Sequence, residues 1–251
     1  MELNVILAIV SLQIRPLERK IIFVHQPKTG GANFAQILKN SYGRKAVYRD
    51  KDRAKERLNE YLLSKGEKVE RHEDQFYDRL KYKVIYGHFS PLKYRRRFPK
   101  AFYMTFFRDP VQRIVSHYHY WKRAEIVDEN SMHPLQKELL ENDYSIEQFS
   151  SIVQKNRLEK NYHNNYVMEN FNFSGIMEEY DLSVELLKRM HLPELIDFKE
   201  EVINVNPEKN LTEKYKVENQ EFFDNLFEED IKNYNKVKDQ FHKNCRKQRL
   251  I

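Results

Sequence analysis

Two short segments of the chain carry residues of the types that bind phosphate groups. In the first, 23–31, an apolar run leads into a turn that holds Lys28, a threonine and two glycines. In the second, 107–118, Arg108 follows another apolar run, and a proline stands where a first helical turn tolerates a missing N–H. A strand that passes through such a turn into a helix directs free backbone N–H groups at an anion. The two segments therefore predict a ligand with two phosphate-like ends.

His88 follows the apolar segment 83–87 and is the candidate general base. A neutral imidazole can take a proton from a hydroxyl group at ordinary pH. Because the chain has nine histidines, a packed, hydrogen-bonded structural histidine stays open as the alternative. His25 is expected to brace the first turn, and His117 and His119 are expected to be structural.

A basic run, 93–97, follows His88 closely. Lys93 and Arg95 within it are candidates to contact carboxylates or sulfates of an acidic acceptor. A solvated basic turn is an equal alternative, because charge clusters are common on protein surfaces. No grouping of His, Cys and carboxylates indicates a metal site, and none is expected. The complete phosphate loop of nucleotide triphosphatases is also missing, which argues against ATP hydrolysis.

The elements that must position these residues alternate between strand and helix. Strands are predicted over 21–25, 83–87 and 102–107, and helices from the first turn to about residue 42 and over 111–123. The remaining predictions are helices over 146–153, 181–190 and 221–242, and weaker strands over 174–177 and 202–205.

This alternation predicts an α/β fold with a parallel sheet flanked by helices. Ligands of such sheets bind beyond the carboxyl ends of the strands, where the Lys28 turn, His88 and Arg108 would all lie. The charged region 50–80 is expected to form surface helices or a mobile insertion before the next strand.

Length and composition fit one domain over residues 1–251, with 40% hydrophobic residues to supply a core. The net charge of +6 favours anionic ligands without deciding a function. The single Cys245 cannot form a disulfide within the chain, so a reducing cytoplasm is the expected compartment. The apolar stretch 5–10 is far shorter than the roughly 20 residues that cross a bilayer, so no transmembrane span is predicted and 1–20 is expected to be peripheral. A chain trimmed from a Golgi-type protein would show the same pattern.

The two anion-binding segments resemble known motifs. Segment 25–31, His-Gln-Pro-Lys-Thr-Gly-Gly, resembles the 5′-phosphosulfate loop of carbohydrate sulfotransferases. Segment 108–120 is similar to their 3′-phosphate motif, particularly in the heparan sulfate 2-O-sulfotransferase branch and its bacterial relatives. Softer similarity continues through 161–167, 175–179 and 204–207. The resemblance implies the sulfotransferase fold, whose sheet is like that of P-loop nucleotide triphosphatases.

The resemblance also implies a donor, 3′-phosphoadenosine 5′-phosphosulfate (PAPS), which is released as 3′,5′-bisphosphoadenosine (PAP) without help from a metal. Lys28 would stabilise charge on the leaving group, and Arg108 with Ser116 would bind the 3′-phosphate. The backbone that would bind the 5′-phosphate belongs to Thr29, Gly30, Gly31, Ala32 and Asn33.

One departure from the family is Ala32-Asn33, where relatives commonly have Thr-Ser. A hydroxyl contact to the 5′-phosphate is therefore replaced, and Asn33 could donate through its amide instead. For the second motif, the alternative is a surface pair of Arg108 with Asp109. Arg113 is expected to make a structural ion pair.

The function predicted from these residues is transfer of a sulfuryl group from PAPS to a hydroxyl, expected on a carbohydrate, by in-line displacement with His88 as base. The acceptor's identity stays open, and no nucleic-acid partner is expected for the enzyme. The alternative is a noncatalytic module that binds polyanions, either sulfated glycan or nucleic acid, through its basic surface.

Overall fold

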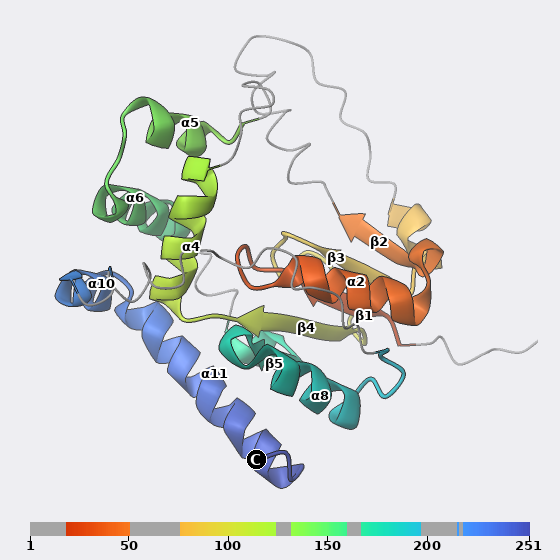
Figure 1. Cartoon of the computed structure of the whole chain (residues 1–251). Coiled ribbons are helices and arrows are strands. Elements are labelled where there is room, and N and C mark those ends of the chain that lie inside the picture. Colours follow the sequence, from red (N-terminus) through yellow and green to blue (C-terminus); the bar gives the residue numbers. More distant parts are fainter. Residues whose placement is uncertain (1–18, 51–75, 124–131, 160–166, 197–214, 216–217) are drawn as a thin grey trace, which may run out of the picture.

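The structure is a computed structural model that describes residues 19–50, 76–123, 132–159, 167–196, 215 and 218–251. Within these residues the strands form one five-stranded sheet in the order β2-β3-β1-β4-β5 (Figure 1). Every neighbouring pair is parallel, so all the carboxyl ends share one edge. The strands are β1 (Ile21–Val24), β2 (Val47–Asp50), β3 (Val84–Gly87), β4 (Phe102–Phe107) and β5 (Phe173–Ile176). The predicted α/β fold with a parallel sheet is confirmed.

Helices cover the sheet and extend beyond one end of it. They are α2 (Gly31–Tyr42), α4 (Pro110–Arg123), α5 (Pro134–Glu141), α6 (Ile146–Glu159), α8 (Tyr180–Met190), α10 (Gln220–Leu226) and α11 (Glu228–Lys247). Short 3-10 helices are η1 (Arg44–Ala46), η2 (Phe76–Lys81), η4 (Met168–Asn170) and η5 (Met177–Glu179). In Figure 1, α2 and α8 lie over the same face of the sheet, and the long α11 runs past the β5 edge.

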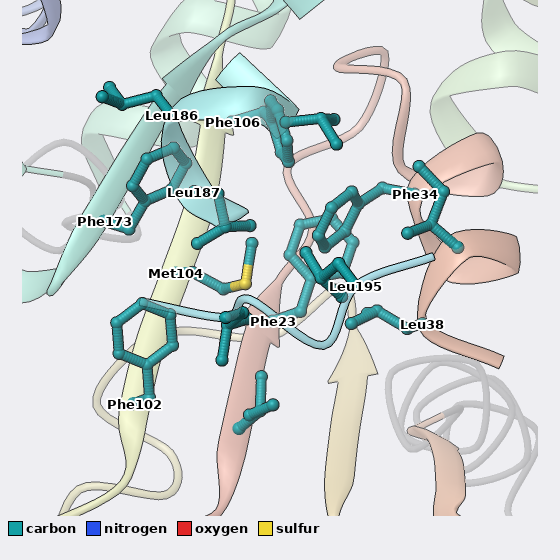
Figure 2. Packing of buried hydrophobic residues seen from close by; sticks show 14 of the residues in the cluster. Phe23, Phe34, Leu38, Phe102, Met104, Phe106, Phe173, Leu186, Leu187 and Leu195 are labelled. Carbon is teal, nitrogen blue, oxygen red and sulfur yellow. The ribbon is translucent and has the colours of Figure 1, made fainter. Parts of the chain in front are cut away.

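The sheet is buried on both faces, which explains why its strands read as continuous apolar runs. In β1, Ile21 and Phe23 belong to the cluster under α2 and α8, while Ile22 and Val24 belong to the cluster on the opposite face. Figure 2 shows the first cluster, in which the Phe23 ring packs against Phe34 of α2 and Phe106 of β4, and residues of β5 and α8 complete the cluster. The opposite face is covered by apolar residues of the segment 89–101.

A third cluster lies around α4, away from the sheet. Ile114 and Val115 of α4 pack with Leu139 of α5, Phe149 of α6 and Phe223 of α10. This packing holds α4 at the point where it leaves β4, and the next turns of α4 carry several residues of the candidate site.

Three features differ from the sequence predictions. β2 was not predicted, because its Val-Tyr-Arg-Asp sequence is short, lies at the sheet edge and has charged residues in half of its positions. α5 was also not predicted; it begins with His133 as N-cap and Pro134 in its first turn. The single helix predicted over 221–242 is two helices, α10 and α11, divided at Phe227, whose side chain is buried in the α4 cluster.

The other predicted elements agree closely, including β1, β3, β4 and β5 and helices α2, α4 and α8, while α6 starts as predicted but continues to Glu159, beyond the predicted end at residue 153. Of the charged region 50–80, residues 76–81 form the helix η2, and 51–75 lie outside the described residues. The predictions for 1–18 and 202–205 also fall outside them.

Candidate functional site

The two predicted anion-binding corners meet at the carboxyl edge of the sheet. β1 and β4 are direct neighbours, so the turns that follow them lie side by side. Arg108 Nη1 donates a hydrogen bond to the backbone oxygen of Lys28 at 3.1 Å. Residues 80 positions apart in sequence therefore form one contiguous surface.

Two hydrogen bonds of the Lys28 corner join residues within the corner itself. Thr29 Oγ1 donates to the backbone oxygen of Gln26 at 2.8 Å, and the Gly31 N–H donates to His25 Nε2 at 3.1 Å. Because Nε2 must carry a lone pair to accept, His25 is neutral here, and its burial lowers its pKa to about 3. The bracing role predicted for His25 is confirmed.

The left-handed backbone favours glycine at position 30, and packing against the His25 ring requires it at position 31. Gly30 has φ of 70°, and a Cβ there would lie 2.5 Å from Met177 Sδ. A Cβ on Gly31 would lie 2.0 Å from His25 Cδ2. Lys28, two positions before Gly30, also adopts a left-handed conformation, with φ of 68°. The corner is thus a tight turn, and because its two glycines have no side chains, Met177 and His25 can pack directly against the backbone.

The site concentrates positive charge. The Lys28 ammonium lies 4.0 Å from the centroid of the Tyr120 ring. Burial lowers the pKa of Lys28 to about 8, with further lowering from the charges of Arg108 and Arg123. Burial also lowers the pKa of Arg108. Cations that repel one another in a partly desolvated site favour an anionic ligand, so this set of donors fits a nucleotide with phosphate groups.

The α4 helix contributes further residues to this charged surface. Ser116 is buried, and Tyr120 lies four positions later on the same helical face. Since Tyr120 contacts Lys28, that face of α4 is directed toward the Lys28 corner. Arg113, three positions before Ser116, is buried. Burial lowers the pKa of His117, and the positive charges of Arg113 and Lys28 lower it further.

Ala32 and Asn33 lie in the first turn of α2. Ala32 is exposed, and Asn33 is partly buried. The Asn33 Oδ1 atom is buried and has no hydrogen-bond partner within the described part of the chain. The amide that replaces the family's hydroxyl is therefore not committed through its oxygen to another described residue.

His88 is held at the edge of the Lys28 corner. It follows β3, and its Nδ1 lies 2.8 Å from the backbone oxygen of His25. A carbonyl oxygen only accepts, so Nδ1 carries a proton, and in the neutral form of the ring the lone pair lies on Nε2. The two imidazole rings lie 4.4 Å apart between centroids. The backbone thus selects the tautomer that a general base acting through Nε2 requires.

Lys93 and Arg95, the candidates for acceptor binding, have contacts that stabilise the fold. Lys93 Nζ lies 3.0 Å from Oδ2 of the buried Asp50. The Arg95 guanidinium lies 4.1 Å from the Tyr103 ring centroid and donates to the backbone oxygen of Asn170. These contacts favour a structural role for the two residues, while Arg96 and Arg97 of the same run are exposed.

Sequence reasoning missed the residues that surround Arg108. Glu178 Oε1 accepts a hydrogen bond from the Asp109 N–H at 3.1 Å and lies 3.9 Å from Arg108 Nε. Tyr234 donates to Glu178 Oε2 at 2.9 Å. Asp109 Oδ1 accepts from the Gln112 N–H at 2.9 Å, which caps α4. The Asp-x-x-Gln spacing around a proline could have indicated this cap, but no local pattern links Tyr234 to Glu178.

The fold is an α/β fold, and its positively charged candidate site lies beyond the carboxyl ends of parallel strands. The sequence matches the family model described as the sulfotransferase family over residues 17–243. The chain therefore belongs to the sulfotransferase family, whose members are transferases.

Comparison with solved structures found a sulfotransferase from Alicyclobacillus acidocaldarius, with 16% sequence identity and a TM-score of 0.41. The alignment covers 83% of this chain and 94% of that one. Comparison with curated proteins found no match. In the part of the chain that the structure describes, no helix is both long and apolar enough to cross a membrane.

Proposed function

We propose that this protein transfers a sulfuryl group from PAPS to a hydroxyl group, with a carbohydrate as the acceptor class. Family membership supports sulfuryl transfer, and the similarity of segment 108–120 to heparan sulfate 2-O-sulfotransferases supports a sugar acceptor. The observation that carries the proposal is the hydrogen bond between Arg108 and the Lys28 backbone, because it joins the two corners into one site for a ligand with two anionic ends.

The bound nucleotide supplies the activated sulfuryl group. Lys28 stabilises the negative charge that develops as the leaving oxygen departs. Backbone N–H groups of the first α2 turn and the Asn33 amide bind the 5′-phosphate. Arg108 and Ser116 bind the 3′-phosphate, since a guanidinium presents paired donors to phosphate oxygens.

His88 accepts the proton of the acceptor hydroxyl on Nε2 as the hydroxyl oxygen attacks sulfur. The His25 carbonyl favours the neutral tautomer of His88 with its proton on Nδ1, so Nε2 is the nitrogen that accepts the proton in this proposal. Binding donor and acceptor in one geometry supplies the remainder of the rate enhancement. A cytoplasmic location accompanies this proposal, because Cys245, the single cysteine, is free and buried.

The test is transfer of sulfur label from PAPS to a panel of acidic and neutral glycans by the wild type and two variants. His88→Ala is expected to lower kcat by about 10²- to 10⁴-fold while the Kd for PAP stays within about twofold of the wild type. Lys28→Ala is expected to lower kcat by about 10²- to 10³-fold and also to weaken PAP binding.

Two control variants separate these effects from loss of stability. His191→Gln removes an imidazole that lies between Phe102 and Phe173, at the amino ends of β4 and β5. Lys83→Ala removes a cation that lies over the Tyr42 ring, just before β3. Both controls should retain turnover. Equal product from the wild type, His88→Ala and Lys28→Ala would refute the assigned roles, and failure of the wild type to bind PAP would refute the donor.

A further inference from the structure

The Arg108 side chain is held by two parts of the chain that lie far from it in sequence. Nη1 donates to the Lys28 backbone oxygen, and Nε lies 3.9 Å from Glu178 Oε1. Neither contact uses Nη2. The side chains of Arg108 and Glu178 are only 17% and 24% exposed, so the pair is partly desolvated and its geometry is restricted by packing.

The Glu178 carboxylate connects three elements. It belongs to η5, just after β5; one oxygen accepts the Asp109 N–H at the start of α4, and the other accepts the Tyr234 hydroxyl from α11. Tyr234 is buried, and burial together with the charge of Glu178 raises its pKa, so the phenol stays protonated and acts as the donor. The carboxylate is therefore fixed at both oxygens.

We propose that Glu178 and Tyr234 are positioning residues for the 3′-phosphate. They orient Arg108 so that its remaining guanidinium N–H groups face that phosphate, and they bring α11 into the donor site. This inference rests on the proposed use of PAPS. A carboxylate beside a phosphate site repels the ligand, so its presence is explained by the orientation that it imposes on Arg108 rather than by attraction.

The orientation of Arg108 should affect binding of nucleotides with a 3′-phosphate more than binding of nucleotides without one. Glu178 contacts the Arg108 corner and Tyr234 contacts Glu178. The hydrogen bonds inside the Lys28 corner join Thr29 to Gln26 and Gly31 to His25, and neither involves Glu178 or Tyr234. Loss of the Tyr234 hydroxyl should therefore weaken binding of PAP, which has a 3′-phosphate, and leave binding of AMP, which has only the 5′-phosphate, unchanged. A purely structural role would change both affinities together.

The experiment compares Tyr234→Phe with Tyr42→Phe, each measured by calorimetric titration with PAP and with AMP. Tyr42 donates to Glu194 at 2.5 Å, so the control removes the same kind of tyrosine–glutamate hydrogen bond elsewhere in the fold. Tyr234→Phe is expected to raise the Kd for PAP by about three- to tenfold, as coupling through a shared partner does, with the AMP Kd unchanged. Tyr42→Phe should change neither Kd.

Tyr234→Phe is also measured in an Arg108→Ala background, to test whether Tyr234 acts through Arg108. If Tyr234 acts through Arg108, Tyr234→Phe adds no further loss of PAP affinity there. Equal PAP affinities of the wild type and Tyr234→Phe, or parallel losses for PAP and AMP, would overturn the inference while leaving the proposed function intact. If the wild type itself failed to bind PAP, the proposed function and this inference would both fall.

Discussion

The two corners of the site differ in how far along the chain their contacts reach. In the Lys28 corner, Thr29 bonds to a residue three positions away and Gly31 to one six positions away. In the Arg108 corner, the partners are Lys28, 80 positions away, and Glu178, 69 positions from Asp109. A short loop closes at small entropic cost, whereas the second corner exists only after the sheet and α11 have assembled.

This difference indicates how each corner will respond to amino-acid substitutions elsewhere in the chain. Two local hydrogen bonds shape the Lys28 turn, and contacts with Arg108 and His88 attach it to the neighbouring strand ends. The Arg108 side chain depends on several elements at once, so substitutions in η5 or α11 should alter nucleotide binding from positions that need not touch the nucleotide. The two corners can therefore be tested separately with ligands that carry one or both phosphates.

Arg108→Ala should have the largest effect on the difference between the corners. Removing a desolvated guanidinium that binds phosphate is expected to raise the PAP Kd by about 10²-fold. The AMP Kd should rise only about two- to threefold, through loss of the bond to the Lys28 backbone, since a neutral-acceptor hydrogen bond contributes less. Isothermal titration with both nucleotides measures the ratio. Equal losses for PAP and AMP would mean that the corners are not separate subsites.

The pH dependence of PAP binding tests the charge shared by the corners. Lys28 has a pKa lowered to about 8, so above pH 8 the free protein loses the ammonium charge. A bound anion favours the charged form and raises this pKa; hence PAP affinity should fall above pH 8, by up to about tenfold per pH unit, with uptake of a proton on binding. Titrations between pH 7 and 10 measure the fall.

Two variants sharpen this result. In Lys28→Ala the decline above pH 8 should disappear, because the titrating group is absent. In Arg108→Ala the decline should begin at higher pH, because one of the charges that lower the Lys28 pKa is removed. A decline that survives in Lys28→Ala would assign the titration to another group.

Thr29→Val should have the smallest effect, since it removes one local hydrogen bond. The buried Gln26 carbonyl loses its donor, so the free energy of unfolding should fall by about 1–3 kcal/mol, measured by urea denaturation. AMP binding should weaken by about two- to fivefold as the turn loosens.

Thr105→Val is the matched control, because Thr105 Oγ1 donates to the Val24 backbone oxygen at 2.7 Å within the sheet. It should lose similar stability without a change in AMP affinity. If both valine variants weakened AMP binding equally, the effect would be one of global stability and not of the Lys28 turn.

Much of the fold could be predicted because many of its strands and helices are indicated by residues that lie close together in the sequence. Continuous apolar runs identified β1, β3 and β4, since strands buried on both faces need no polar alternation. β2 was not predicted because it is a short edge strand with Arg49 exposed and Asp50 at its end, and pairing with β3 stabilises it more than its own residue types do. The break at Phe227 depends on burial of its ring against α4 and α6 neighbours, which no helical period reveals.

By itself, the sequence determined the Lys28 turn, the proximity of Arg108 to a helix start and the place of His88 after a strand. Each follows from residues within a few positions of one another, whose geometry is limited by the chain itself. Only the tertiary structure decided that Lys28 rests on Tyr120, that the His25 carbonyl selects the His88 tautomer, and that Glu178 and Tyr234 hold the Arg108 corner. Those contacts join separate elements, and their geometry is set by how the sheet and helices pack.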